Sequence, residues 1–382
     1  MVELLIVIAI IALLMSLTFS VMYGLTTQAE EVATTTTVRK IDALLQQRMD
    51  AFNRALKGNR LDAAVSIVSV TLASQQIFGV REEVKEILAK KRSFRFEFPQ
   101  RLVERLVEEH PTGSSPKVAG LPDSLFKAFA EPEARQQLVN EGNATPTAQE
   151  VLDRATQNWQ KHRPETESAE LLYFALTAST SYGVGAVDTD RFTDEEVADT
   201  DEDGLPEFVD AWGQPLRFYR WPTRLIDSAP PVPFTPVLSD TADATDVRAI
   251  PMVDRDRAGL LFRGLSPPPL PLPNGVLPRD LLLTDPDDPV GRLYSELERL
   301  DGTNGKPRFA DEFNEAKYHT PETYHAPLVV SAGADGALGL LEPNDTDAAA
   351  GRFGNLAQFD GNDVDALTDN ITNRNRRVGG RR

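Results

Sequence analysis

The chain contains no cysteine among its 382 residues. It therefore forms no disulfides, and it cannot use a thiolate as a metal ligand or as a nucleophile. Histidine is almost as scarce. The only four are His110, His162, His319 and His325, and no two of them have the H-x₃-H spacing of a metal site. We therefore interpret each histidine as a surface or packing residue.

Basic residues are outnumbered, with 40 Lys+Arg against 58 Asp+Glu and a formal net charge of −18. This balance disfavours nucleic acid as a partner, because phosphates attract basic surfaces, and it is compatible with divalent cations. The motifs G-x-S-x-G, H-E-x-x-H and the P-loop are also absent. We predict that the chain is not an enzyme, and we interpret Asp188, Asp190 and Glu195 as part of a solvated acidic segment.

Charge is missing altogether from residues 4–29, although Glu3 stands immediately before them. A helix needs ~20 mostly apolar residues to cross a hydrocarbon core of ~30 Å, and this run supplies them. The pattern predicts a membrane-spanning helix with one acid at its tip. The alternative is a plain signal anchor or signal peptide, but the run is too long for a signal-peptide core and has no basic n-region.

The string VELLIVIAIIALLMSL at residues 2–17 resembles the N-terminal segment of type IV pilins and type II secretion pseudopilins. In that family a prepilin peptidase cuts a short basic leader after a glycine and methylates the new N-terminus. The resemblance implies that the true start lies upstream of Met1. It also implies that Glu3 pairs with the N-terminal amine of a neighbouring subunit and thereby sets the register of a filament.

Apolar residues continue at steps of three and four after this run, which predicts one long helix. They are Val32, Val38, Ile41, Leu45, Met49, Phe52 and Leu56. We predict a transmembrane half at residues 1–29 and an amphipathic half at residues 30–57. The rest is predicted to comprise a mostly helical region at 58–185, an acidic calcium-type loop and the start of a sheet at 186–221, a Pro-rich insertion at 222–326, a C-terminal sheet and turn at 327–372, and a disordered basic tail at 373–382.

Residues 199–210 fit the calcium-loop pattern D-x-D-x-D-G-x₅-[DE], with Asp in the last place where Glu is usual. Alternate carboxylates converge on a hard cation, and Gly204 permits the sharp turn. We predict a calcium site with these ligands: Asp199, Asp201, Asp203, the peptide oxygen of Leu205, Glu207 and Asp210. Pro206 argues against a helix leaving the loop, so no paired EF-hand is expected. The alternative is a solvated acidic turn.

The segment DAWGQPLRF at residues 210–218 resembles the D-P-W-G-x-P-Y-x-Y element of the major pseudopilins of type II secretion. The strand and turn PLVVSAGADGALG at 327–339 and the segment DNITN at 369–373 resemble later elements of the same family. The resemblance implies a small antiparallel sheet and a second calcium loop, with Ser331, Asp335 and Asp369 as candidate ligands. Over a hundred residues separate the first two elements here, so the chain is interpreted as an enlarged relative with large insertions.

These patterns predict an α+β, pilin-like fold: a long N-terminal membrane-spanning helix packed on a small antiparallel sheet, with an added helical region and a Pro-rich insertion. The expected function is that of a structural subunit of a type II secretion pseudopilus or a type IV filament, with calcium as cofactor. The expected location is the inner membrane, with the C-terminal domain on the periplasmic side. Which secretion or pilus system it serves, and whether it is a major or a minor subunit, stay open.

The expected partners are other pilin or pseudopilin subunits, an inner-membrane assembly platform, prepilin peptidase and membrane lipid, with no nucleic acid. The alternative function is a pilin-anchored exported binding or adhesion domain that does not polymerise. Its support in the sequence is the Pro-rich insertion and the surplus of acidic residues.

Overall fold

The computed structural model describes residues 2–74, 77–110, 113–179, 184–222, 261, 287–288, 292, 326–347, 350, 352–361 and 365–375. In the N-terminal helix, the side chains of residues 2–8, 17–21, 23 and 24 are outside the described set. Most of the predicted Pro-rich insertion and the last seven residues also lie outside it. The structural statements below concern the described residues.

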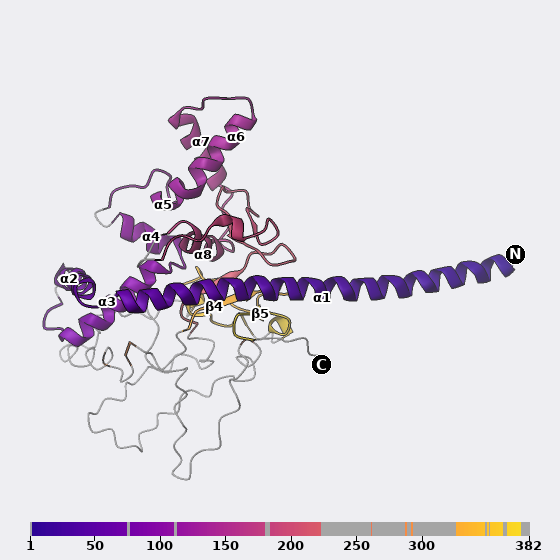
Figure 1. Cartoon of the computed structure of the whole chain (residues 1–382), viewed down its shortest axis with the longest axis horizontal. Coiled ribbons are helices and arrows are strands. Elements are labelled where there is room, and N and C mark those ends of the chain that lie inside the picture. The colour runs from indigo at the N-terminus through magenta and orange to yellow at the C-terminus, as the bar shows by residue number, and fades with distance from the viewer. Residues whose placement is uncertain are drawn as a thin grey trace, which may run out of the picture.

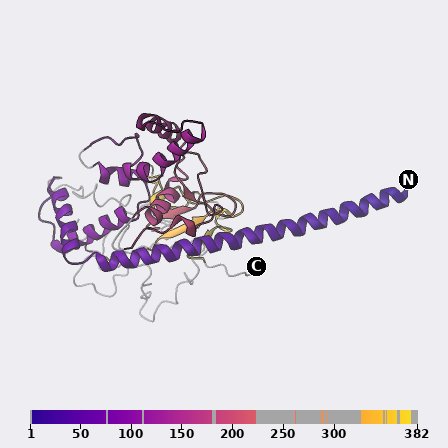
Figure 2. The same cartoon turned by 45° about the horizontal axis from the view of Figure 1, so that its top comes forward.

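The longest element is α1 (Val2–Ala55), a single helix of 54 residues. At about 1.5 Å per residue it is about 80 Å long. Its N-terminal half projects away from the rest of the molecule, and its C-terminal half lies along the other elements (Figures 1 and 2). We call the C-terminal half of α1, together with everything that packs around it, the head.

The prediction that residues 1–29 span a membrane is wrong for the part of the chain that the structure describes. None of the described helices is both long enough and apolar enough to cross a membrane. The predicted spanning helix, the inner-membrane location and the assignment to a membrane protein are corrected accordingly. The described fold is a mixture of helices and small sheets.

Seven further α-helices follow in the helical region. They are α2 (Asn59–Ser74), α3 (Glu82–Glu97), α4 (Leu102–Glu109), α5 (Asp123–Leu125), α6 (Glu131–Asn140), α7 (Ala148–Trp159) and α8 (Glu167–Thr177). A π-helical turn (Phe126–Ala130) joins α5 to α6. The start of α7 is fixed by a reciprocal pair, in which the Thr147 hydroxyl accepts from the Glu150 amide while the Glu150 carboxylate accepts from the Thr147 amide.

The strands are short and form two antiparallel sheets. β1 (Val197–Ala198) pairs with β2 (Glu207–Phe208). The second sheet has the order β3 (Arg217–Tyr219), β4 (Leu328–Ser331) and β5 (Ile371–Thr372), with Phe218 opposite Val329 and Ser331 opposite Ile371. The sheet thus brings together segments that lie more than a hundred residues apart. Three-residue 3₁₀ turns at Thr189–Arg191, Gly354–Leu356 and Asp365–Leu367 complete the assigned elements.

The core of the head forms where α1 meets α8 and the three-stranded sheet. Val38, Ile41 and Leu45 are at most 1% exposed, and they share one cluster with Leu176 of α8 and Val329 of β4. Side chains alternate across β3 and β4. Phe218 and Val329 therefore belong to this cluster, whereas Tyr219, Leu328 and Val330 join a second one with the C-terminal turns. The sheet is buried on both faces.

Polar contacts also fix α1 on the head. The Arg48 guanidinium donates to the carbonyls of Leu176 (3.0 Å) and Ser179 (2.7 Å), at the C-terminal end of α8 where carbonyls lack helical partners. Lys40 pairs with Glu196 at 2.6 Å. These contacts hold the second half of α1 on the head. The first half has no charged residue between residues 4 and 29 that could form ion pairs of this kind.

The predicted disordered tail at 373–382 differs from the structure at its beginning. Asn373 is buried, and its side-chain amide donates to Asp42 of α1 at 2.8 Å. Asn375 is 3% exposed and donates to the Asn370 carbonyl at 2.8 Å. Asn373 thus connects the end of β5 to α1, and Asn375 satisfies a backbone carbonyl beside β5. Residues 376–382 lie outside the described residues.

Candidate metal centre

The acidic loop connects β1 to β2, so the short hairpin fixes both of its ends. The Asp199 carboxylate accepts hydrogen bonds from the amides of Asp203 (3.1 Å) and Gly204 (3.0 Å). Gly204 has φ +92° and Glu202 has φ +61°, so the chain makes two left-handed turns in three residues. Glycine adopts this conformation at no steric cost. The loop therefore curls around the carboxylate of its first residue.

Asp201 and Asp203 point inward, towards the turn between α7 and α8. Asp201 Oδ2 accepts from the Arg163 amide at 2.8 Å and from the Thr166 hydroxyl at 3.0 Å. Asp203 Oδ2 lies 2.7 Å from His162 Nδ1, and its Oδ1 accepts from the Leu205 amide at 2.7 Å. Both aspartates are almost completely buried. The loop thus places two carboxylates inside the head.

Glu170 of α8 faces the same space. Its side chain is 1% exposed, Oε1 lies 3.6 Å from His162 Nδ1, and neither carboxylate oxygen has a hydrogen-bond partner among the described residues. Every residue of α8 is buried, so a carboxylate in this helix cannot reach bulk water. Burying an ionised carboxylate without a partner costs several kcal/mol or more.

Ligand atoms of His162, Glu170, Asp201 and Asp203 all lie within 4.8 Å of one another. This is an acidic group with the residue types and spacing to hold a metal ion. The group combines one imidazole nitrogen with three carboxylates, and all three carboxylates are buried. We call these four residues the acidic cluster.

The electrostatics of the cluster call for a counter-charge. Burial raises the pKa of Glu170 well above its ordinary value, and the nearby Asp203 raises it further. Burial also raises the pKa of Asp199 to about 6 and that of Glu207 to about 8. These carboxyl groups repel one another when ionised. A divalent cation would lower these pKa values by favouring the charged form.

The other ligands predicted for the loop are oriented differently. Glu207 turns back to accept from the amide of Thr200 at 2.8 Å, and its Oε2 has no hydrogen-bond partner in the described part of the chain. Leu205 is fully buried. Asp210 leaves the loop, since its Oδ1 accepts from the Trp212 and Gln214 amides at 3.0 and 2.9 Å. The six predicted residues therefore do not converge on one point.

The predicted second calcium loop is divided between two places. Ser331 donates to Asp210 Oδ2 at 2.7 Å and is fully buried. The Asp335 carboxylate accepts from the Ala337 amide at 2.8 Å, and its own amide donates to Asp369 Oδ2 at 3.1 Å. Asp369 Oδ1 has no described hydrogen-bond partner. Ser331 is thus grouped with Asp210, while Asp335 and Asp369 form a separate turn.

His162 and Glu170 were not predicted as ligands. His162 follows α7, and its ring stacks on Trp159 with centroids 4.2 Å apart, which is consistent with a packing role as well. Glu170 carries a usable signal in the sequence, because the mostly apolar segment SAELLYFALTAS at residues 168–179 contains a single carboxylate. A charge in such a helix requires a partner.

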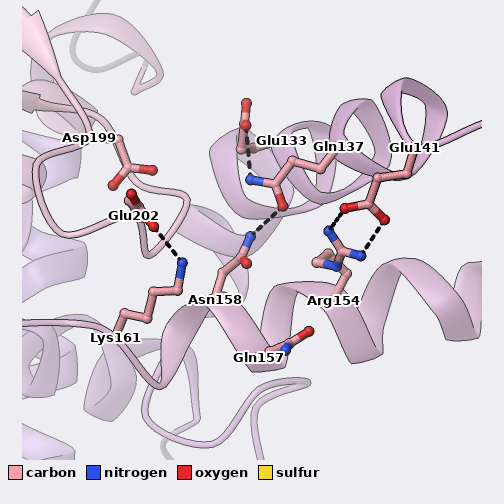
Figure 3. Close-up of a pocket in the computed structure, with 9 residues that line it drawn as sticks. All are labelled: Glu133, Gln137, Glu141, Arg154, Gln157, Asn158, Lys161, Asp199 and Glu202. Carbon is pink, nitrogen blue, oxygen red and sulfur yellow. Dashed lines mark hydrogen bonds and ion pairs between the residues drawn. The ribbon is translucent and has the colours of Figure 1, made fainter.

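A polar pocket of about 530 Å³ borders the acidic loop (Figure 3). Its lining comes from α6 and α7, from Glu141 and Lys161 just beyond the ends of these helices, and from the loop residues Asp199 and Glu202. The charged groups that span it are paired, with Arg154 on Glu141 at 2.6 and 2.7 Å and Lys161 on Glu202 at 2.7 Å. We interpret the pocket as a solvent-filled surface depression beside the acidic loop.

Glu3, the residue predicted to set filament register, lies in the first turn of α1. Its side chain is outside the described set.

Comparisons with protein-family models, with curated proteins and with solved structures found no match to this chain.

Proposed function

We propose that the protein is a structural subunit that assembles with copies of itself, and with related subunits, through the N-terminal half of α1. The resemblance of residues 2–17 to pilins and pseudopilins suggests that the assembly is a type II secretion pseudopilus or a type IV filament. The protein would then have no catalytic role.

The exposed apolar surface of the projecting helix carries this proposal. Ile10, Ile11, Leu13 and Leu14 are 54%, 47%, 64% and 58% exposed, and Met22 further along is 61% exposed. Successive residues of a helix are turned by about 100°. Together with Ala9, Ala12 and Met15, which are also exposed, these residues therefore cover every side of it. A helix that is apolar all round is buried in its functional state.

Other copies of the same helix are the partner that fits this surface. Fully burying an Ile, Leu or Met side chain contributes about 1.5–3 kcal/mol, so the five side chains named above supply enough driving force for helix packing. The whole chain carries a formal charge of −18, so heads repel one another and do not favour direct contact. We propose that Glu3, at the tip of the helix, fixes the axial offset by pairing with a neighbour's N-terminal amine.

We propose calcium as the ion of the acidic cluster. Calcium prefers carboxylate and carbonyl oxygens, and the loop at residues 199–210 has the spacing of a calcium loop. The ion would stabilise the head, since a ligand that binds only the folded state shifts the equilibrium towards it.

Engineered cysteines test the assembly directly because the chain has none of its own. Leu14→Cys is expected to form disulfide-linked dimers under mild oxidation, and more of them as protein concentration rises. Val70→Cys on α2 is a matched control, since Val70 is 70% exposed but lies on the head. Equal and low cross-linking at both positions would reject assembly through α1 and favour the alternative of a binding domain that does not polymerise.

A further inference from the structure

We infer that Glu170 of α8, and not Asp210 of the loop, is the carboxylate that closes the calcium site on Asp201 and Asp203. The inference rests on the proposed calcium binding. It assigns the ligand that lies outside the loop and predicts which carboxylate can be removed without loss of binding.

Asp210 is directed away from the acidic cluster. Its Oδ1 accepts from the Trp212 and Gln214 amides and its Oδ2 accepts from the Ser331 hydroxyl at 2.7 Å. Asp201 and Asp203 are hydrogen-bonded as well, but their carboxylates lie within 4.8 Å of Glu170 and Asp210 does not belong to that group. These bonds connect the loop's exit to β4 and stabilise the turn that leads into β3. To bind an ion with the loop, Asp210 would have to abandon three hydrogen bonds and leave the Ser331 hydroxyl, which is fully buried, without its acceptor.

Glu170 has the opposite properties. Both of its oxygens lack hydrogen-bond partners among the described residues, and its side chain is 1% exposed. It faces Asp201 and Asp203, whose charges and whose shared burial disfavour its ionised form, so a bound cation would stabilise it there. A glutamate with two free oxygens can also bind in the bidentate mode that the last position of a calcium loop normally provides.

His162 is assigned a positioning role. Its Nδ1 is 2.7 Å from Asp203 Oδ2, the distance of a hydrogen bond, and its ring is held against Trp159. A hydrogen bond of this kind orients a ligating carboxylate without occupying a coordination position. Calcium has little affinity for imidazole nitrogen, so the site would be built from oxygen ligands alone.

The arrangement links the ion to the core of the head. Asp201 and Asp203 belong to the β1–β2 connection, whereas Glu170 belongs to α8, whose Leu172 and Leu176 pack in the same cluster as α1. An ion bound by both elements would connect the β1–β2 loop to α8. Calcium binding would therefore be coupled to the stability of the whole head, as for any ligand specific to the folded state.

The test compares calcium titration by calorimetry and thermal unfolding, with calcium or with chelator, for full-length wild type, Glu170→Gln and Asp210→Asn. We expect Glu170→Gln to weaken calcium binding roughly 100-fold or more, because one ligand charge is lost. Without calcium it should unfold at the same temperature as wild type or higher, because a crowded buried carboxylate has been replaced by a neutral group. A variant that merely damages the fold would be less stable in both conditions.

Asp210→Asn is the matched control. It should retain calcium affinity within about threefold, because Asp210 is not a ligand, while lowering the unfolding temperature equally with and without calcium, since its hydrogen bonds are structural. The reverse pattern, with binding lost in Asp210→Asn and kept in Glu170→Gln, would overturn the assignment of Glu170. The proposal that the protein binds calcium would still stand.

Two further outcomes would contradict the assignment differently. If wild type binds no calcium at millimolar concentration, the calcium part of the proposed function fails, whereas assembly through α1 is measured independently. If Zn²⁺ or Mn²⁺ binds much more tightly than calcium, and His162→Gln abolishes that binding, then His162 is a ligand and the site is not a calcium site. Calcium binding that survives in His162→Gln with only a modest loss of affinity supports the positioning role.

Discussion

The two halves of α1 belong to one uninterrupted helix but are in opposite environments. In the second half, Ile41 and Leu45 are fully buried against α8 and the sheet. In the first half, Leu13 and Leu14 are more than half exposed. The difference shows that apolar content alone does not determine what a helix packs on. The spacing of the apolar residues determines it. An apolar stripe on one face, as in the second half of α1, packs against the head on that face, whereas a helix that is apolar on all faces, as in the first half, is buried only when it has neighbours on all sides.

This comparison predicts a separation of effects. Substitutions in the second half of α1 should change the free energy of unfolding of the head and leave association unchanged. Substitutions in the first half should do the reverse. The predictions below proceed from the largest expected effect on the head to the smallest.

Arg48→Met should have the largest effect in the second half. It removes the guanidinium that donates to the end of α8 and lies 3.6 Å from Glu97, with both side chains almost fully buried. Breaking a buried charge pair from one side costs about 3–5 kcal/mol. Denaturant unfolding measures the loss. Arg39→Met, at an exposed position of the same helix, should stay within about 0.5 kcal/mol of wild type.

Leu45→Ala is expected to cost about 2–5 kcal/mol, because it leaves a cavity in the centre of the head. Leu45 is fully buried and contributes to the core shared with α8 and the sheet. Val32→Ala, where the side chain is 61% exposed, is the comparison on the same helix. If both substitutions cost the same, the second half of α1 does not pack on the head as described.

Lys40→Met should have the smallest effect, about 1 kcal/mol or less, because the pair with Glu196 is partly exposed. Its signature is in the pH dependence. Burial acts to raise the pKa of Glu196, but the hydrogen bond from Lys40 and other contacts outweigh it and lower the pKa. A depressed pKa in the folded state contributes stability above the ordinary glutamate pKa, and this contribution is lost as pH falls.

Unfolding free energies of wild type and Lys40→Met, measured from pH 7 down to pH 3, should therefore converge at the acidic end. A difference that stays constant over this range would show that the ion pair is not what stabilises the contact.

Local patterns in the sequence predicted much of the head. Of the predicted apolar stripe, Val38, Ile41, Leu45, Phe52 and Leu56 are buried and Met49 is partly buried, whereas Val32 at its beginning is 61% exposed. The run LVVS at residues 328–331 coincides with β4. These features depend on periodicity within a few turns or residues, so one segment is sufficient to recognise them.

What the sequence could not predict depends on distant contacts. The π-helical turn joining α5 to α6 has no simple pattern. The sequence predicted a cation site within one continuous loop. In the structure, Asp210 of that loop is instead bonded by Ser331, 121 residues away. The carboxylate that joins Asp201 and Asp203 comes from Glu170 of α8. A loop motif identifies residues that are capable of ligation, and the tertiary fold decides which of them meet.

The most direct test of the central claim is the molar mass of the full-length protein in solution, measured by sedimentation for wild type and Leu14→Arg over a range of concentrations. We predict that wild type forms oligomers that grow with concentration and that Leu14→Arg is a monomer with unchanged unfolding of the head. An unchanged distribution of oligomers in Leu14→Arg, or a monomeric wild type, would contradict assembly through the N-terminal half of α1.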